Sequence, residues 1–237
     1  MNPATVIIFG GSSGIGEAAA MRLLKSGLRV IIVGRDQDRL EKARGRIASS
    51  VEIASVDATN RESVNKFFEH IGKFEHLILS FSGGKGAGPF KDINIDDIRS
   101  GMEGKFFSQL SVAQSALRNL ETGGSITFIS AGSARVALPG TSGLAAINGA
   151  IEAIVPTLAK ELAPIRVNAV SPGVIDTPWW NAMPKELKDN VFRQTAERLP
   201  VRRVGHPQDV AQAIAFLVED TFITGTIISV DGGAHLS

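Results

Sequence analysis

Three glycines with the spacing of a phosphate-binding turn follow the first apolar run of the chain. Gly10, Gly14 and Gly16 come directly after residues 6–9, where a buried strand gives way to a helical pattern. Glycine has no β-carbon, so the chain can turn tightly and bring backbone amides close to a pyrophosphate at the positive end of a helix. Glycines also build ordinary turns, but the position between strand and helix favours a nucleotide-binding loop.

The end of the second apolar run indicates which nucleotide suits this loop. Residues 30–33 are followed by Gly34, Arg35 and Asp36. An acidic side chain here would accept hydrogen bonds from the ribose hydroxyls of NAD(H), whereas Arg35 offers a 2′-phosphate a charge and a planar fork of donors. We therefore expect NADP(H) rather than NAD(H). Alternatively, Arg35 is a solvated residue at the start of the next helix, and Asp36 faces a ribose.

The elements that must position these residues alternate along the whole chain. Apolar runs rich in β-branched residues are typical of parallel strands covered on both faces, and helical stretches lie between them. This alternation predicts an α/β fold of Rossmann type, a doubly wound parallel sheet with helices on both faces. No repeat or linker divides residues 1–237, so we expect a single domain. The expected strands are 6–9, 30–33, 51–56, 77–79, 126–129, 165–170 and 226–230, and the expected helices are 14–26, 38–48, 62–71, 98–120 and 145–162.

Composition excludes several classes of function. A formal net charge of +1 gives no long-range field that would attract nucleic acid or a membrane surface. The chain has no cysteine, which excludes disulfides and thiolate catalysis, and its four histidines lack the spacing of a metal site. No apolar run reaches the roughly 18 residues of a membrane span, and the N-terminus lacks a signal-peptide pattern. We expect a soluble, cytoplasmic protein that binds neither nucleic acid nor membranes.

Residues 9–16, with the sequence FGGSSGIG, resemble the glycine signature of the short-chain dehydrogenase/reductase family. Three later segments continue the resemblance over nearly the whole chain, at residues 167–178, 202–211 and 223–233. The resemblance implies a single NAD(P)-binding domain with a small-molecule substrate. It also implies a homodimer or homotetramer that packs through the two long helices.

The same resemblance indicates which residues contact the dinucleotide. Asp57 is similar to the family's aspartate that contacts the adenine amine. It is equally a candidate N-cap of the helix that begins near Asn60, and the two roles are compatible. The backbone of Ile175 and the hydroxyl of Thr177 would hold the nicotinamide carboxamide and a phosphate. The full set of expected cofactor-binding residues is Gly10, Ser12, Ser13, Gly14, Ile15, Gly16, Arg35, Asp57, Ala58, Ser82, Gly83, Pro172, Gly173, Ile175 and Thr177.

The proton-transfer residues of the family are replaced in this chain. Family members use a tyrosine phenol, a lysine that lowers its pKa, a serine that orients the carbonyl and an asparagine that supports a water chain. This chain contains no tyrosine. An alignment anchored on the helix after the fifth strand places Asn148 at the lysine, Leu144 at the tyrosine and Ala131 at the serine. Matching the preceding helix places Lys105 at the asparagine, and a different anchor would place Gly101 there.

Lys105, Ser130 and Asn148 are therefore the expected catalytic residues. In the family fold the positions of Lys105 and Asn148 face each other, so Lys105 is expected beside the nicotinamide as a proton donor or as an anchor for an anion. Burial there would lower its pKa towards neutrality. Asn148 would orient Lys105 or the substrate. Alternatively, Lys105 is a solvated lysine on the helix surface. Ser130 ends the fifth strand near the edge where ligands of such sheets bind, and it orients the substrate or simply satisfies the backbone.

Two further loops are expected to border the site. Lys85, in the glycine-rich segment 83–89, either binds an anionic group or stays solvated in a flexible loop. Trp179 and Trp180 follow the nicotinamide-side segment, where the family has its substrate lid. Two adjacent tryptophans in an irregular loop rarely both enter the core, so we expect at least one to cover the substrate or a subunit contact.

Two functions explain the expected cofactor-binding residues equally well. The first is an NADP(H)-dependent oxidoreductase that acts on a small carbonyl, alcohol or imine, with Lys105, a serine or water as the proton donor. The second is a catalytically inactive NADP(H)-binding sensor or partner subunit. The nicotinamide-side segment favours the enzyme, whereas the loss of the family's serine, tyrosine and lysine favours the binder. Non-redox chemistry on a structurally bound nucleotide is a third interpretation.

Overall fold

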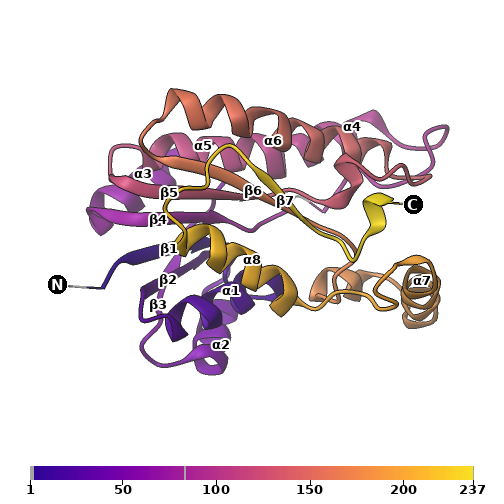
Figure 1. The fold of residues 1–237 in the computed structure, drawn as a ribbon, viewed down its shortest axis with the longest axis horizontal. Helices are drawn as coiled ribbons and strands as arrows, with labels where there is room; N and C mark the ends of the chain where they lie inside the picture. Colours follow the sequence, from indigo (N-terminus) through magenta and orange to yellow (C-terminus); the bar gives the residue numbers. More distant parts are fainter. Residues whose placement is uncertain (1–2, 83, 237) are drawn as a thin grey trace.

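A parallel sheet of seven strands forms the centre of the molecule (Figure 1). The computed structural model describes residues 3–82 and 84–236. The strand order is β3-β2-β1-β4-β5-β6-β7, and every neighbouring pair runs parallel. This arrangement confirms the predicted α/β fold of Rossmann type. The strands are β1 (Thr5–Phe9), β2 (Arg29–Gly34), β3 (Glu52–Ser55), β4 (Phe74–Leu79), β5 (Leu120–Ile129), β6 (Arg166–Pro172) and β7 (Ile227–Val230).

Helices cover both faces of this sheet. In Figure 1, α5 and α6 lie on one side of the strands, and α1, α2 and α8 lie on the other. The helices are α1 (Gly14–Lys25), α2 (Gln37–Ile47), α3 (Arg61–Ile71), α4 (Ile95–Gly101), α5 (Ser108–Ala116), α6 (Ser142–Glu161), α7 (Lys185–Arg198) and α8 (Pro207–Glu219). Shorter turns are the π-helix η1 (Met102–Phe107) and the 3₁₀ turns η2 (Gly132–Ala134), η3 (Pro178–Ala182) and η4 (Ala234–Leu236).

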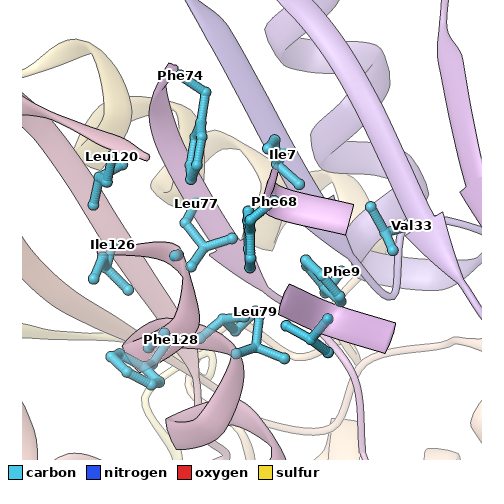
Figure 2. Packing of buried hydrophobic residues seen from close by; sticks show 14 of the residues in the cluster. Ile7, Phe9, Val33, Phe68, Phe74, Leu77, Leu79, Leu120, Ile126 and Phe128 are labelled. Atoms are coloured by element: carbon cyan, nitrogen blue, oxygen red, sulfur yellow. The ribbon is translucent and has the colours of Figure 1, made fainter. Parts of the chain in front are cut away.

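The core has two apolar layers, one on each face of the sheet. Successive residues of a strand point to opposite faces, so Ile7 and Phe9 of β1 join one layer while Val6 and Ile8 join the other. Figure 2 shows the first layer, where Phe9 packs near Phe68 of α3. The ring centroids of these two residues are 6.0 Å apart. Burial on both faces explains why the strands have continuous apolar sequences.

The predicted helix at 98–120 is wrong in two respects. The structure divides the segment into α4, η1 and α5, and the helix ends at Ala116 because Leu120 already pairs with Phe74 in the sheet. At the junction of η1 and α5, the hydroxyl of Ser108 donates to the carbonyl of Glu103 over 2.6 Å. The helices α7 and α8 were not among the predicted elements. Of these, α7 has no buried residue within the described chain, so its sequence carries no clear apolar face.

By length and composition alone, α6 is a helix that could cross a membrane, the one such helix among the described residues. Its inner face packs into the first core layer through Ile151, Val155 and Ala159. A core helix has the same length and apolar content as a membrane span, so this feature is a weak sign of membrane insertion.

Candidate active site

The glycine turn after β1 is packed too tightly for any larger residue. A β-carbon added at Gly10 would lie 2.4 Å from the carbonyl oxygen of Ser80, and one at Gly16 would lie 2.3 Å from that of Gly10. Gly10 also has a φ of +82°, which side chains other than glycine rarely adopt. The turn therefore brings the start of α1 directly onto the carboxyl ends of β1 and β4.

The start of α1 is suited to a phosphate group. Ser13 is the N-cap residue, and its side chain makes no capping hydrogen bond to the described part of the chain. The first-turn amides of a helix have no partner within the helix, and its dipole favours an anion there. Thr177 lies across this turn, because a β-carbon on Gly14 would be 3.3 Å from Thr177 Cγ2. The predicted phosphate loop and the predicted nicotinamide-side segment are thus adjacent, with Ile15 in the first turn of α1.

Arg35, the residue predicted to bind a 2′-phosphate, directly follows β2. Its side chain is exposed, and its carbonyl accepts a 3.2 Å hydrogen bond from Ser55 Oγ. The preceding residue, Gly34, lies near the glycine turn, since a β-carbon on it would be 3.7 Å from Ser12 Oγ. Asp36 caps α2 by accepting from the backbone amide of Arg39 over 3.0 Å. The arrangement fits a phosphate better than a ribose diol.

Asp57 and Ala58 follow β3 on the same edge. Hydrogen bonds from the backbone amide and hydroxyl of Thr59 lower the pKa of Asp57, with a smaller contribution from the positive charge of Arg35. The alternative that Asp57 caps the next helix is wrong. Asn60 is the N-cap of α3, and its side chain accepts from the amide of Ser63 over 3.0 Å. Asp57 is therefore not needed as a cap.

The other expected cofactor residues also lie at the carboxyl ends of strands. Ser82 follows β4, and its hydroxyl accepts from the amide of Gly84 over 3.3 Å. Gly83 lies outside the described residues. Pro172 ends β6, and a β-carbon on Gly173 would be 2.8 Å from Cα of Asp231. The predicted cofactor residues that are described thus line one continuous edge of the sheet.

Lys105 is buried, with 8% of its surface exposed. Its ammonium donates to Asn148 Oδ1 over 2.7 Å and to the carbonyl oxygen of Ser130 over 3.1 Å. Burial lowers the pKa of Lys105 to about 8, and the negative charge of Glu152 opposes this shift. The alternative of a solvated surface lysine is wrong. The predicted pairing of Lys105 with Asn148 is present.

The side-chain amide of Asn148 is held in place by two hydrogen bonds that its nitrogen donates. Its Nδ2 donates to Ser133 Oγ over 3.1 Å and to the carbonyl oxygen of Leu144, one turn earlier in α6, over 2.8 Å. The amide oxygen is therefore left pointing at Lys105. Hydrogen bonds fix this orientation, so the amide oxygen of Asn148 can hold the ammonium of Lys105 in place.

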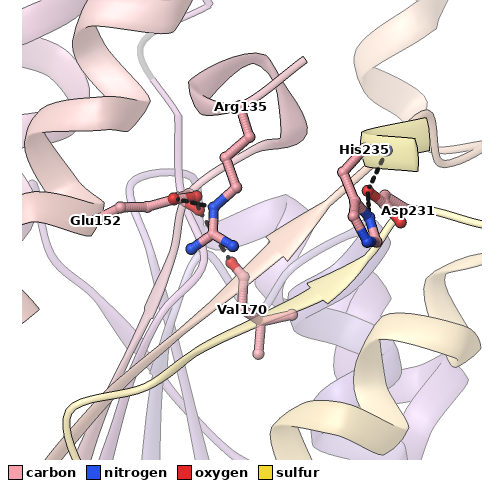
Figure 3. A network of polar contacts seen from close by, with 6 residues as sticks. Arg135, Glu152, Val170, Asp231 and His235 are labelled. Atoms are coloured by element: carbon pink, nitrogen blue, oxygen red, sulfur yellow. Dashed lines mark hydrogen bonds and ion pairs between the residues drawn. The ribbon is translucent and has the colours of Figure 1, made fainter. Parts of the chain in front are cut away.

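Ser130 contacts a buried carboxylate that the sequence analysis did not identify. Its hydroxyl donates to Glu152 Oε1 over 2.7 Å. Figure 3 shows the second partner of this carboxylate, Arg135, whose Nε donates to Glu152 Oε2 over 2.7 Å. Glu152 follows Asn148 by four residues in α6, and residues with this spacing share one face of a helix. That spacing was the available signal for Glu152. Because its hydroxyl is bound to Glu152, Ser130 acts on Lys105 through its carbonyl.

The π-helix η1 places Lys105 on the inner side of its helix. A π turn adds one residue to the normal helical turn and occurs frequently at functional sites. Directly after it, Gln109 Nε2 donates to the carbonyl of Phe81 over 3.0 Å, which ties the helix to the end of β4. Thus a local irregularity brings a lysine to the edge where the dinucleotide residues lie.

A cleft of about 590 Å³ opens beside this network. Its walls are mainly apolar, and they include Phe90, Leu138 and Ala145. Ser133 and Arg135 also line the cleft, and both are bonded to the Lys105 network through Asn148 and Glu152. The cleft is therefore large enough for a small apolar molecule, and Ser133 and Arg135 connect its wall to the network of Lys105.

The two tryptophans cover the nicotinamide-side segment rather than entering the core. Trp180 Nε1 donates to the carbonyl of Ile175 over 2.9 Å, and its ring packs edge-on against Phe192 of α7 at 5.4 Å. Trp179 is 47% exposed. In the other predicted loop, Lys85 forms a 2.9 Å ion pair with Asp97 of α4.

Comparisons with known proteins agree with the fold. The family model described as enoyl-(acyl carrier protein) reductase matches residues 10–235. Human 3-oxoacyl-[acyl-carrier-protein] reductase is 31% identical, with 97% of each chain covered. Glucose 1-dehydrogenase from Gluconobacter oxydans is 31% identical over 98% of this chain and 91% of its own. A solved small-chain dehydrogenase in complex with NADPH is 36% identical, has a TM-score of 0.85, and covers 99% of this chain and 100% of that one.

These matches, together with the glycine turn and the doubly wound sheet, define the class of protein. The chain belongs to the short-chain dehydrogenase/reductase family of oxidoreductases. Its sequence contains no tyrosine.

Proposed function

We propose that this protein is an NADP(H)-dependent oxidoreductase that acts on a small carbonyl, alcohol or imine and exchanges its proton through Lys105. The observation that carries the proposal is the buried ammonium of Lys105, held between Asn148 and Ser130 at the carboxyl edge of the sheet. A proton donor works best when its pKa is near the working pH, and burial brings the pKa of Lys105 to about 8.

The hydrogen bonds of Lys105 suit it to give up one proton without rearrangement. An ammonium has three N–H bonds, and the described residues provide two acceptors, Asn148 Oδ1 and the carbonyl of Ser130. A bound nicotinamide supplies the hydride. As the substrate oxygen takes the third proton of Lys105, an N–H bond breaks and an O–H bond forms. The neutral amine that remains still donates its two N–H bonds to Asn148 and Ser130.

The choice of NADP(H) rests on Arg35. Its side chain is exposed, and the negative side chain nearest to it in sequence, Asp36, is engaged in capping α2. One relative of known structure is described as a complex with NADPH. To test the choice, the dissociation constants of NADPH and NADH are measured for the wild type, Arg35→Ala and the control Arg39→Ala. Arg39 is likewise exposed, at the start of α2.

Arg35→Ala is expected to weaken NADPH binding by about ten- to a hundredfold, because a hydrogen bond to a charged group is lost. NADH binding should change little, and Arg39→Ala should bind both cofactors like the wild type. Equal affinities of the wild type for NADH and NADPH would contradict the assignment.

The redox activity itself is tested with a panel of substrates. NADPH oxidation is followed with apolar ketones, imines and 3-oxoacyl thioesters, the last because one relative carries the name of a 3-oxoacyl reductase. Lys105→Ala should reduce the rate by roughly 10²–10⁴-fold, the usual effect of removing a positioned acid. Lys85→Ala is the matched control, since Lys85 is ion-paired outside the network. An unchanged rate in Lys105→Ala would exclude Lys105 as the donor.

The second candidate function is a catalytically inactive NADP(H)-binding sensor or partner subunit. The complete absence of tyrosine favours it. Tight NADPH binding without turnover on any member of the panel is the outcome that this alternative requires. For either function, we propose a cytoplasmic homodimer or homotetramer that packs through α5 and α6.

A further inference from the structure

A buried carboxylate lies one helical turn beyond Asn148. Glu152 of α6 is 9% exposed, and each of its oxygens accepts a hydrogen bond. Ser130 Oγ donates to Oε1 and Arg135 Nε donates to Oε2, both over 2.7 Å. A buried charge that is hydrogen-bonded on both oxygens keeps a fixed position, because any other arrangement would leave it unpaired.

Ser130 connects this carboxylate to the lysine. Its hydroxyl is bound to Glu152, whereas its carbonyl accepts from Lys105 Nζ. Its backbone amide is bound to the carbonyl of Val170 over 3.0 Å, so the residue is held on three sides. Glu152 therefore fixes the side chain of a residue whose backbone holds Lys105 in place.

Glu152 is also the acid that acts on Lys105 through space. Its negative charge raises the pKa of Lys105 against the stronger lowering by burial. The other charged groups of the surrounding elements are differently placed. Glu103, on η1 itself, is exposed; Lys85 and Asp97, near α4, form an exposed ion pair; and Arg135, after η2, is paired with Glu152.

We infer that Glu152 is a positioning residue that keeps Lys105 protonated and aimed at the substrate, and that Arg135 sets the strength of this effect by partly neutralising Glu152. The catalytic consequence rests on the proposed function. The electrostatic coupling between Glu152 and Lys105 does not, since it is a property of the folded chain alone.

The coupling is measured directly by NMR on the full chain labelled with ¹³C at lysine Cε. The resonance of Lys105 is assigned from its loss in Lys105→Met, and its titration is then followed in Glu152→Gln, Arg135→Met and Arg135→Lys. Glu103→Gln is the matched control, because it removes an exposed acid from η1.

Glu152→Gln is expected to lower the pKa of Lys105 by about one unit, the smaller end of the effect of a nearby opposite charge. Arg135→Met is expected to raise it, because Glu152 loses its neutralising partner. Arg135→Lys should restore a value close to that of the wild type, and Glu103→Gln should leave it unchanged. If Glu152→Gln does not fold, the upward shift in Arg135→Met still tests the inference.

An unchanged titration of Lys105 in both Glu152→Gln and Arg135→Met would overturn the inference. The pH profile of NADPH-dependent turnover provides the second measurement, in which the falling limb should move in the same direction as the NMR titration. Shifted NMR titrations without turnover on any substrate would support the coupling and refute the proposed function. A failure of the inferred coupling can thereby be distinguished from a failure of the proposed function.

Discussion

The pKa of Lys105, which burial lowers to about 8 while Glu152 opposes the shift, determines the expected pH dependence of catalysis. Reduction of a carbonyl consumes the proton of the ammonium, so its rate needs the protonated form. We expect kcat/KM for reduction to be constant below pH 8 and to fall about tenfold per unit above it. Oxidation of the alcohol needs the neutral amine, so kcat/KM should rise up to pH 8 and then level off.

The two directions are measured between pH 6 and about pH 10, at a fixed ionic strength, with any substrate pair that turns over. Lys105→Met should remove both limbs, because no group with this pKa remains, whereas Lys85→Met should keep them. Profiles with the same inflection in Lys105→Met and the wild type would show that another group exchanges the proton.

At the residue scale, the sequence predicted the exchange of lysine and asparagine but not their partner. Lys105 and Asn148 stand out in the sequence because the family resemblance places each at a position where another residue type is expected. Glu152 does not depart from that pattern, and the sequence alone does not distinguish a buried glutamate from an exposed one. Its burial depends on Arg135 and Ser130, which reach it from a different part of the chain. Only the three-dimensional arrangement brings these residues together.

At the element scale, the cap of α3 makes a prediction about stability. Asn60 accepts from the amide of Ser63, and the helix that it starts carries Phe67 and Phe68 into the core. Asn60→Ala should lower the free energy of unfolding by about 1 kcal/mol, the usual cost of removing an N-cap side chain. Asn60→Asp, which keeps a capping oxygen, should stay close to the wild type.

This difference is measured by urea denaturation of the two variants and the wild type under identical conditions. Equal losses in Asn60→Ala and Asn60→Asp would show that the side-chain hydrogen bond contributes nothing. NADPH affinity serves as the control, since Asn60 is not among the expected cofactor residues and neither variant should alter it.

The elements that the sequence predicted well are those with a strong apolar pattern. β1 is buried along its whole length, and its apolar run at residues 6–9 could hardly form anything but a central strand. The π turn η1 was not predicted, because no apolar pattern around Lys105 distinguishes a π-helix from an ordinary helix. The helix α8 does carry an apolar face, with Val210, Ile214 and Leu217 buried, and its spacing was an available signal that went unused.

At the scale of the whole molecule, we expect association through a face that includes exposed apolar residues of η1 and α6. Phe107 is 48% exposed at the end of η1, where it packs against Phe106 with ring centroids 5.1 Å apart. On α6, the outward residues include the small side chains of Ala146 and Ala153, which allow another helix to approach closely. Burial of this face against a second copy would remove apolar surface from water, which favours association.

We therefore expect light scattering after size exclusion to give two or four times the 25.1 kDa mass of the chain. Phe107→Glu should shift the protein to the monomer, because a charge in an apolar interface must be desolvated without a partner. Leu187→Glu is the matched control: Leu187 is 49% exposed on α7, which lies away from α5 and α6 in Figure 1. A monomeric wild type, or an oligomer that only Leu187→Glu dissociates, would contradict assembly through this face. Retained NADPH binding in monomeric Phe107→Glu would further show that the dinucleotide site is complete within one chain.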